Sequence, residues 1–584
     1  MNYQLTTSDN TKQGDSPLKA LGTLGRLLLT ERTRMLLALV ALLANSGLTI
    51  WAPIVLGHGI DRHLVVGDYT GVLWYTGYLA AMYVGAAILG YIQTRIMGGV
   101  AQRVLYRLRN RLFTKLQELP IAFFNQNKAG DLISRINNDT DKLNQFFSQS
   151  LMQLVGNAFV IVGSGIAMVV VNDRLGAVTL LPAVGLLLFT QLTARWIKRR
   201  NLTSLQSLGG MSAEVQESLE NFRIIVAYNR RDYFRERFSE VNNTNYNAAV
   251  SAGIATNTLT PVYNLASNLG QLIVVVYGLY LITHGSLTFG LLVSYMAYAN
   301  RFYHPLRQMA SIWANLQAAL AGWDRISEIL AMENNLVIVP DRNKKDDALL
   351  EFDNVAFAYP GGTPVIEDVS FTFKPGKTYA FVGPTGGGKT TTASLIARLY
   401  DPTEGVVRLH GKDIRSYSEA ERAAKIGFIL QDPYLFNGTV ADNLLYGHPT
   451  YTPAKTDLEK VLKQSGLDSL LTRFDNGLET PVSTSGDGLS LGQRQLIAFM
   501  RAVLRNPELL ILDEATANVD TVTEQLLEEI LSKLPKSTTR VVIAHRLNTI
   551  ANADEIYFVN RGTVTKAGSY EHALTLLTSG QRTS

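Results

Sequence analysis

The chain has 584 residues, too many for a single compact domain, and a length-based expectation is about two to four domains. Charged residues are only 18% and hydrophobic residues 47% of the chain, whereas soluble proteins carry roughly a quarter charged residues. Nucleic-acid binding would need the basic residues on one face together with base-reading or stacking groups, whereas many basic residues of this chain, whose net charge is +5, flank apolar segments and favour a membrane topology. Without any cysteine, the chain has no disulfide, thiolate catalyst or Cys-ligated zinc.

The N-terminal segment is polar and lacks a charged-then-apolar leader. Met1–Asp15 therefore predicts no cleavable signal peptide. Pro17–Thr30 has apolar residues at helical spacing with Lys19 and Arg26 between them. This pattern predicts a helix lying in the cytoplasmic membrane interface, within a cytoplasmic region 1–34. The alternative is that these residues only begin the first spanning helix.

Six apolar stretches follow, each close to the ~20 residues that cross ~30 Å of hydrocarbon. A core helix of a soluble protein rarely stays apolar for so long, so the six predict a transmembrane domain over residues 35–332. The stretches are Met35–Leu56, Leu73–Gln93, Leu151–Val171, Leu175–Ile197, Pro261–Ile282 and Leu287–Ala310.

The connections between these stretches predict the topology. The connections after the second and fourth stretches are long, helical in character and basic, with Arg95, Arg103, Arg107, Arg109, Arg111 and Lys115 in one and Arg195, Lys198, Arg199 and Arg200 in the other. The positive-inside tendency places both long connections, and hence both termini, in the cytoplasm. We expect a bacterial inner membrane, with an organellar membrane as the alternative.

The second half of the chain has a different composition. Glu333–Leu349 contains Pro340 and mixed charges, which predicts an interdomain linker. From Leu350 to the end, short β-branched strands alternate with amphipathic helices. This alternation predicts an α/β domain over 350–584 with a largely parallel sheet.

A phosphate-binding loop pattern, G-x-x-x-x-G-K-[ST], follows the strand-like Thr378–Val382 and opens a helix at Thr391. Its glycines let backbone N–H groups approach phosphate, and the helix N-terminus adds positive potential. We expect the lysine to bridge the β- and γ-phosphates of ATP and the last hydroxyl to bind Mg²⁺. The loop consists of Gly383, Pro384, Thr385, Gly386, Gly387, Gly388, Lys389 and Thr390, and the adjoining Thr391 is also expected to bind the nucleotide.

Leu509–Glu514 is an apolar strand that ends in two carboxylates. Neighbouring strand residues point to opposite sides, so the two acids have different roles. Asp513 is expected to hold Mg²⁺ through its water shell, and Glu514 to polarise the attacking water as general base. Upstream, Ser490 and Gly492 lie at the start of the helical Leu496–Arg505 and form a second anion site. Because one chain already has its own phosphate loop, this second site suggests nucleotide bound to a partner chain.

Together these motifs resemble an exporter-type ABC half-transporter over nearly the whole chain. Leu489–Gln493 (LSLGQ) is similar to that family's signature, which closes over ATP on the opposite subunit and here includes Gln493. The resemblance implies that Tyr359 stacks on adenine and that Gln431 contacts Mg²⁺ and the attacking water. It further implies a loop between the two sites at Ala517–Asp520, and a switch histidine at His545 that touches the γ-phosphate.

Two stretches of the membrane half resemble the cytoplasmic coupling regions of these exporters: Phe123–Asp139 and Glu217–Ile225. In the family the second docks into the opposite nucleotide domain; ordinary amphipathic packing is the alternative. The resemblance implies an ATP hydrolase that exports drugs, lipids or peptides as half of a dimer in a lipid bilayer, with ATP and Mg²⁺ bound. The alternative functions are an importer on the same architecture and an ATP-gated channel or regulator.

The family pattern is altered near the signature. Leu491 stands where a small residue is usual, and Ser483 and Thr484 stand where a glycine and a glutamate are usual. With Glu514 and His545 intact, this mixture resembles the catalytically competent half of a heterodimeric exporter. We therefore expect a heterodimer with a partner that lacks an equivalent of Glu514, and a homodimer stays open.

The last two apolar stretches carry polar residues that suit an amphipathic substrate, although such residues often only hydrogen-bond neighbouring helices. Arg301 is a charge well inside the sixth stretch, and it is expected to meet an anionic substrate, pair within the protein or reach the cytoplasm. The other polar residues are Tyr263, Asn264, Asn268, Gln271, Tyr277, Tyr295, Tyr298 and Asn300.

Overall fold

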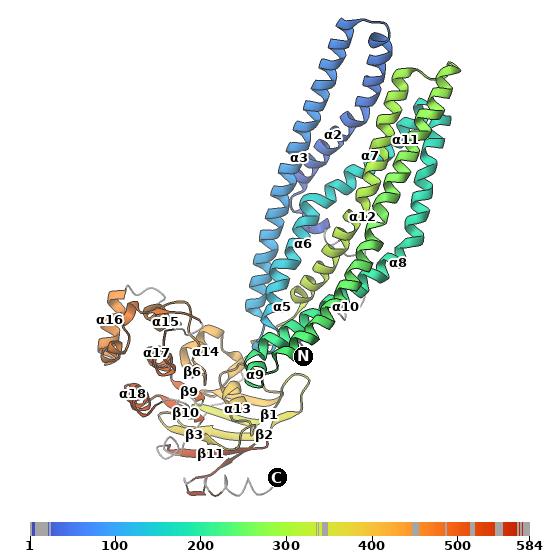
Figure 1. Ribbon diagram of the computed structural model, residues 1–584. Coiled ribbons are helices and arrows are strands. Elements are labelled where there is room, and N and C mark those ends of the chain that lie inside the picture. The colour runs from blue at the N-terminus through green and yellow to red at the C-terminus, as the bar shows by residue number, and fades with distance from the viewer. Residues whose placement is uncertain are drawn as a thin grey trace. The chain divides into compact units, whose positions relative to one another are not determined.

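The structure, a computed structural model, confirms the predicted fold class: a helical membrane domain followed by an α/β domain (Figure 1). It divides into a helical unit, Thr6–Leu116 and Gly130–Ala331, and an α/β unit, Met1–Leu5, Gln117–Ala129 and Met332–Ser584. It describes residues 3–5, 22, 25–334, 336, 338–340, 348–446, 455–484, 488–513, 520–543, 553–568, 571–572 and 575.

The six predicted apolar stretches lie within long helices of the helical unit. Of the predicted interfacial helix, residues 22 and 25–30 are described, and all of these except Thr30 are helical. The long helices are α2 (Arg32–Gly59), α3 (Tyr69–Glu118), α7 (Leu151–Val171), α8 (Asp173–Glu220), α10 (Arg231–Asn257), α11 (Leu259–Thr283) and α12 (Phe289–Ala331). Shorter helical pieces are η2 (Ile60–Leu64), α5 (Ala129–Ser134), η3 (Arg135–Asp139), α6 (Thr140–Gln145), η4 (Phe146–Ser150) and α9 (Phe222–Ala227).

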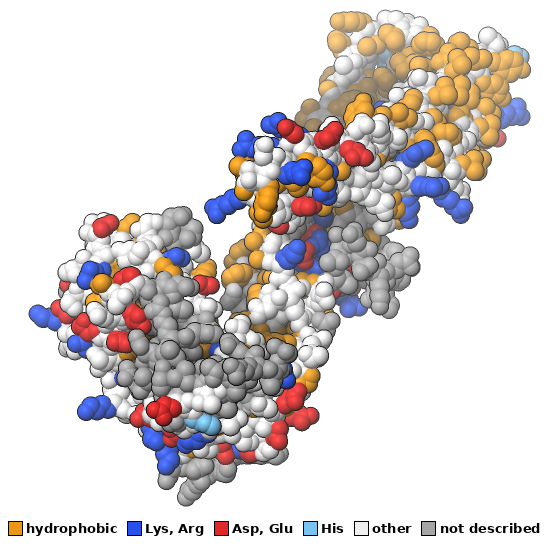
Figure 2. All heavy atoms as spheres, turned by 60° about the horizontal axis from the view of Figure 1, so that its bottom comes forward, with side chains coloured by type: hydrophobic (Ala, Val, Ile, Leu, Met, Phe, Trp, Pro, Cys, Tyr) orange, Lys and Arg blue, Asp and Glu red, His pale blue; other side chains and the backbone are white. Residues whose placement is uncertain are grey.

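The outer surface of the helical unit is apolar. Leu192 on α8 is 81% exposed, and Val170 on α7 and Trp74 on α3 are exposed to a similar degree. Figure 2 shows hydrophobic side chains gathered over one end of this unit, with charged side chains gathered toward its other end. An apolar surface of this size is unfavourable in water and favourable in contact with the hydrocarbon of a lipid bilayer.

Among the described residues, five helical segments are long and apolar enough to span a membrane, one fewer than the six predicted spans. The sixth stretch forms the first half of α12, a helix of 43 residues, and is not among the five. Asn300, Arg301 and His304 lie close together there and lower its mean hydropathy. Helix α12 packs against α2, α7 and α11, while Asn300 and His304 on it are exposed and Arg301 is half-buried.

Close packing between α2 and α12 depends on glycine. A Cβ atom added to Gly290 would lie 2.0 Å from the carbonyl oxygen of Gly57. Beside this contact, Asp61 accepts hydrogen bonds from the Thr288 hydroxyl (2.5 Å) and from the Gly290 N–H (2.7 Å). The carboxylate therefore satisfies N-terminal donors of α12, which no residue within that helix can do.

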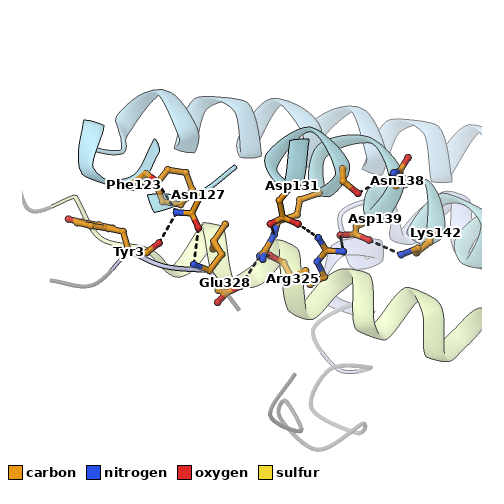
Figure 3. A network of polar contacts seen from close by, with 12 residues as sticks. Tyr3, Phe123, Asn127, Asp131, Asn138, Asp139, Lys142, Arg325 and Glu328 are labelled. Carbon is orange, nitrogen blue, oxygen red and sulfur yellow. Dashed lines mark hydrogen bonds and ion pairs between the residues drawn. The ribbon is translucent and has the colours of Figure 1, made fainter. Parts of the chain in front are cut away.

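A buried ionic network joins α5, η3 and α12 in the helical unit (Figure 3). Arg135 is fully buried and pairs with Asp131 (2.9 Å) and with Glu328 (2.7 Å). Arg325 pairs with Asp131 (2.5 Å) and with the buried Asp139 (3.2 Å). Buried charges persist only when they are paired in this way, so the network fixes the end of α12 against the predicted first coupling region.

The α/β unit is built on a six-stranded sheet in the order β12-β11-β3-β10-β9-β6. Strands β11 to β6 are parallel, and only β12 at the edge is antiparallel. A second sheet, β2-β1-β4-β5, is antiparallel and was not predicted. The strands are β1 (Leu350–Ala358), β2 (Pro364–Phe373), β3 (Thr378–Val382), β4 (Glu404–Leu409), β5 (Lys412–Asp413), β6 (Ile426–Ile429), β7 (Gly438–Thr439), β8 (Pro481–Val482), β9 (Leu509–Asp513), β10 (Thr539–Ile543), β11 (Glu555–Asn560) and β12 (Thr563–Lys566).

Two apolar clusters form the core of this unit, one on each face of the six-stranded sheet. Alternate residues of β9 divide between them: Leu510 and Leu512 join one cluster, and Leu509 and Ile511 join the other. A strand covered on both faces is uniformly apolar, which explains the unbroken Leu-Leu-Ile-Leu run. The helices of the unit are α4 (Ile121–Gln126), α13 (Lys389–Ile396), α14 (Glu419–Lys425), α15 (Val440–Leu445), α16 (Lys455–Gln464), α17 (Leu491–Leu504) and α18 (Thr521–Ser532).

Candidate nucleotide site and coupling segments

The predicted phosphate loop connects β3 to α13. Glycine is required where the loop approaches β11, because a Cβ atom on Gly383 would lie 1.9 Å from the carbonyl oxygen of Val559. Gly388 has φ +110°, a backbone conformation that side chains disfavour, and it immediately precedes α13. The loop therefore presents backbone N–H groups and the first turn of α13 without side chains between them, which is the arrangement that binds phosphate.

Lys389 curls back over this loop. Its side chain is 5% exposed, and Nζ donates to the carbonyl oxygens of Gly383 (2.9 Å) and Pro384 (3.0 Å). The ammonium group is thus held inside the loop rather than extended into solvent. A cation in that place is positioned for phosphate oxygens.

Thr390 and Asp513 meet at the carboxyl edge of the sheet. The Thr390 hydroxyl donates to Asp513 Oδ1 at 3.3 Å, and Asp513 is a buried residue at the end of β9. Among the described residues, no three His, Asp or Glu side chains are close enough to hold a metal ion. A hydroxyl and one carboxylate still fit Mg²⁺, which usually takes one or two protein oxygens, with the rest from phosphates and waters.

Gln431 lies shortly after β6, which pairs with β9 in parallel register through Ile429 and Leu512. The carboxyl ends of neighbouring parallel strands thus bring the phosphate loop, Asp513 and Gln431 to one edge, where ligands of such sheets bind. The predicted base Glu514 and switch residue His545 follow β9 and β10 and lie outside the described residues.

Tyr359 has a defined environment just after β1. Its ring packs edge-to-face against Phe357 (centroids 4.9 Å apart) and Tyr400 (5.2 Å). Its hydroxyl is 3.0 Å from the Thr391 Oγ1 atom on α13. The ring is therefore fixed relative to the helix that begins at the phosphate loop.

The signature residues begin helix α17. Ser490 is the N-cap and forms a capping box with Gln493, whose amide also donates to the Arg473 carbonyl (2.7 Å). Gly492 faces Thr523 so closely that a Cβ atom there would lie 2.7 Å from the Thr523 hydroxyl. The N-terminus of α17 adds positive potential, to which an anion is attracted.

Asp520 joins the same cluster from α18. It is the N-cap of that helix and accepts from the Thr523 N–H (2.9 Å) and hydroxyl (2.7 Å). The hydrogen bonds from the Thr523 side chain and backbone lower the pKa of Asp520 below its ordinary value. The carboxylate therefore stays charged beside the signature helix, whereas Ala517–Val519 of the same loop lie outside the described residues.

Two features of the α/β unit were not predicted. Tyr3 and Leu5 are buried, and their backbone groups form hydrogen bonds with the side chains of Gln126, at the end of α4, and Asn127, directly after it. Asn125 of α4 donates to the hydroxyl of Tyr400. The run Asn125-Gln126-Asn127 after two phenylalanines was the available signal, but sequence alone does not say which partners three adjacent amides choose.

Polar residues predicted to line a substrate path are partly used within the helical unit. Tyr295 and Tyr298 are fully buried; the Tyr298 hydroxyl donates to Ile50 O (2.6 Å), and the Tyr295 hydroxyl donates to Asn172 O (2.7 Å). Gln271 donates to Asn300 between α11 and α12 (2.7 Å). For these four residues the structure supports the alternative of helix-to-helix bonding.

Comparison with known proteins agrees with this organisation. Residues 35–306 match the family model "ABC transporter transmembrane region", and residues 366–517 match the model "ABC transporter". The chain is 32% identical over 566 residues to the uncharacterized ABC transporter ATP-binding protein YfiC of Bacillus subtilis, covering 95% of this chain and 92% of YfiC. It is 33% identical over 494 residues to a fatty acid ABC transporter ATP-binding/permease protein of Mycobacterium bovis, covering 85% and 78% of the two chains.

A multidrug resistance ABC transporter of Lactococcus lactis is 32% identical over 497 residues, covering 84% of this chain and 83% of that protein. Among solved structures, a bacterial Atm1-family ABC exporter with ATP bound has the same fold, with TM-score 0.77, 23% identity and coverage of 95% and 99% of the two chains. The chain belongs to the ABC transporter family and carries the membrane region and the ATPase domain in one polypeptide. It is a membrane-spanning ATPase that couples ATP hydrolysis to transport.

Proposed function

We propose that this chain is one half of a dimeric exporter that moves amphipathic or hydrophobic compounds out of a bacterial cell. The observation that carries the proposal is the fusion of a complete phosphate loop, with Lys389 held inside it, to helices whose outer faces are apolar. The names of relatives as fatty acid and multidrug transporters support a lipid-like or drug-like cargo. Bacterial relatives and the basic long connections support a plasma membrane location with both termini in the cytoplasm.

The same proposal assigns roles at the nucleotide site. The phosphate loop and Lys389 bind the β- and γ-phosphates, and Thr390, Asp513 and Gln431 hold Mg²⁺. Bound Mg²⁺ would neutralise part of the phosphate charge. The 3.3 Å contact between Thr390 and Asp513 supports this assignment.

Glu514 acts as general base on the attacking water, and His545 contacts the γ-phosphate. Ser490, Gly492 and Gln493 bind nucleotide held by the partner subunit, and Asp520 belongs to the loop between the two sites. Support for these assignments comes from the order of the motifs and from the helix start at Ser490.

We infer a division into residues 1–34, 35–332, 333–349 and 350–584. The family matches at 35–306 and 366–517 fall within the second and fourth of these ranges. In this arrangement, ATP bound between two α/β domains favours their closure because closed domains make contacts that open ones do not. Coupling segments transmit closure to the helices, and loss of the γ-phosphate permits return.

The dimer partner is proposed to be a different subunit with a degenerate base. Support comes from Leu491 at the first position of α17 and from Ser483 and Thr484 before it. Purification of this chain alone tests the idea. We expect little ATPase activity until the companion subunit is added, whereas turnover at a rate typical of the family by the single chain contradicts an obligatory heterodimer.

Direction and cargo are tested in inside-out membrane vesicles. A fluorescent amphipathic cation and a fluorescent fatty acid serve as two separate probes, with vesicles of the Lys389→Ala variant as control. Export predicts ATP-dependent accumulation of at least one probe in wild-type vesicles and none in the control. ATP-dependent accumulation only in right-side-out vesicles supplied with internal ATP supports import instead, and ATP-dependent conductance without accumulation supports a channel.

A further inference from the structure

Helix α4, which overlaps the first predicted coupling region, is bonded within the α/β unit to the hydroxyl of Tyr400, a residue that follows α13. The Asn125 Nδ2 group donates to the Tyr400 hydroxyl at 2.7 Å. Burial raises the pKa of Tyr400, with the Asn125 bond opposing that effect, so the phenol is neutral and available as an acceptor. Asn125 and Tyr400 are 275 positions apart in sequence, and neither belongs to a nucleotide-binding motif.

Apolar packing between the α4 segment and the residues around Tyr400 is incomplete. A hollow of about 450 Å³ lies between Pro120 and Ala122 on one side and Phe357, Ala358 and Tyr400 on the other. Loosely packed walls transmit displacement poorly, whereas a short hydrogen bond fixes both distance and direction. The hydrogen bond between Asn125 and Tyr400 therefore couples the positions of these two residues more tightly than the apolar contacts around the hollow do.

Tyr400 is also a wall of the Tyr359 environment. The two rings are 5.2 Å apart and nearly perpendicular (89°), and Tyr400 also contacts Phe357 at 5.4 Å. An edge-to-face contact at this spacing leaves little freedom for one ring to turn without moving the other. Tyr359 in turn is tied to Thr391 at the start of α13.

Segment α4 is held firmly enough to transmit motion. Phe123 is fully buried, and Gln126 and Asn127 each accept a backbone N–H bond from the N-terminal segment, from Tyr3 and Leu5 respectively, at 2.9 Å. Figure 3 shows Asn127 beside Tyr3, to whose carbonyl oxygen it also donates. These bonds anchor the end of α4 that follows Asn125, so movement at Asn125 moves the segment rather than only the side chain.

We propose that Tyr400 is a positioning residue that connects the ring of Tyr359 to helix α4 through Asn125, so that adenine binding and the position of α4 influence each other within one chain. The inference rests on the proposed function, in which Tyr359 stacks on adenine. Because the Tyr359 ring is already held in the orientation that stacks on adenine, ATP binding does not have to order it, and the affinity for ATP is higher. Because coupling between two sites is reciprocal, the placement of α4 sets part of the affinity for ATP.

The test is the steady-state ATPase kinetics of the full transporter, with its companion subunit if one is needed, in lipid nanodiscs. Asn125→Ala and Tyr400→Phe each remove the hydrogen bond while leaving the Tyr400 ring in place. One hydrogen bond corresponds to about a fivefold change in an equilibrium. We expect each variant to raise the KM for ATP about fivefold while kcat stays within about twofold of wild type.

Two further variants separate positioning from general stability. The double variant Asn125→Ala with Tyr400→Phe should show the same KM as either single variant, because both remove one bond. Asn125→Asp should restore the KM, because its carboxylate accepts from the phenol, but should fail to do so when combined with Tyr400→Phe. The matched control is Tyr417→Phe, which removes another buried tyrosine hydroxyl bond, to Leu409 O at 2.8 Å, in the same unit.

The proposal is overturned if Asn125→Ala and Tyr400→Phe give the same KM as Tyr417→Phe, or if their effects multiply in the double variant. Tyr359→Ala distinguishes this failure from failure of the proposed adenine site. If Tyr359→Ala strongly raises the KM for ATP while Asn125→Ala and Tyr400→Phe leave it unchanged, only the proposed connection through Tyr400 is rejected. If Tyr359→Ala leaves the KM for ATP unchanged, both the stacking of Tyr359 on adenine and the connection through Tyr400 are rejected.

Discussion

The two units place the same residue types on opposite sides. In the α/β unit, Leu510 and Ile511 of β9 are fully buried between two apolar clusters. In the helical unit, Leu192 and Val170 are exposed on the outside, whereas the hydroxyl groups of Tyr298 and Tyr303 are directed to backbone carbonyls of neighbouring helices. Burying apolar surface stabilises the first unit, whereas lipid supplies no such force and the second unit relies on polar contacts and close packing.

The largest expected effect tests whether polar contacts stabilise the helical unit. Arg135→Ala removes a fully buried guanidinium group from Glu328 and leaves Asp131 with its remaining pair to Arg325. Breaking a fully buried ion pair costs about 3–5 kcal/mol, and the partial exposure of the two carboxylates places this variant toward the lower end of that range. Arg235→Ala is the control, because its pair with Asp232 is almost fully exposed and is worth about 0–1 kcal/mol. Thermal unfolding in detergent measures both, and equal melting temperatures for the two variants contradict the comparison.

The next largest effect tests whether burial of apolar side chains stabilises the α/β unit. Leu510→Ala removes a fully buried side chain from the larger cluster and should cost about 2–5 kcal/mol. Leu192→Ala, at a position that is 81% exposed, should change the free energy of unfolding by less than about 0.5 kcal/mol. Denaturant unfolding followed by circular dichroism compares the two. A large loss for Leu192→Ala would show that this surface packs against protein rather than lipid.

A smaller effect separates stability from function within the α/β unit. Ser490 and Ser418 are both N-caps in capping boxes, on α17 and α14. Replacing either by alanine should cost about 1 kcal/mol of stability. Only Ser490→Ala should also weaken ATP binding at the partner subunit's site, because only Ser490 lies in the signature. Equal ATP affinities of that site in both variants count against a nucleotide contact for Ser490.

The smallest expected effect concerns single hydroxyl groups in the two surroundings. Tyr303→Phe removes a bond to the Thr179 carbonyl in the helical unit (2.7 Å) and should cost about 0.6 kcal/mol. Tyr417→Phe removes a comparable bond in the α/β unit and should cost about 1 kcal/mol. Unfolding of each variant beside wild type measures the pair. A loss of several kcal/mol for Tyr303→Phe means that neighbouring groups depend on this bond.

The features that could be predicted from the sequence are mainly those determined by residues close together in the chain. The phosphate loop needs glycines beside β11 and a lysine at a fixed place, and both the residues and the strand before them are visible in one short stretch. The apolar stretches are likewise local, because the length of a span follows from the thickness of hydrocarbon. α12 shows the limit of that rule: Arg301 and its polar neighbours reduce the apolar signal in a helix that is packed among others.

The remainder depends on partners that are distant in sequence. Nothing near Tyr295 or Tyr298 indicates that their hydroxyl groups bond carbonyls of α2 and the α7–α8 turn. Similarly, the antiparallel sheet of β1, β2, β4 and β5 depends on pairing between separated strands, and the N-terminal Tyr3 has no local reason to pack beside Asn127. Such contacts are chosen by the assembled fold rather than by local propensity.

The central claim is that hydrolysis of ATP at the α/β unit, with Glu514 as base, drives the transporter. Parallel measurement of Mg-ATP binding and ATP turnover by the Glu514→Gln variant tests it most directly. The account predicts that the variant binds Mg-ATP as tightly as wild type and loses nearly all turnover, because the amide cannot accept the proton of water. Normal hydrolysis by Glu514→Gln would contradict it.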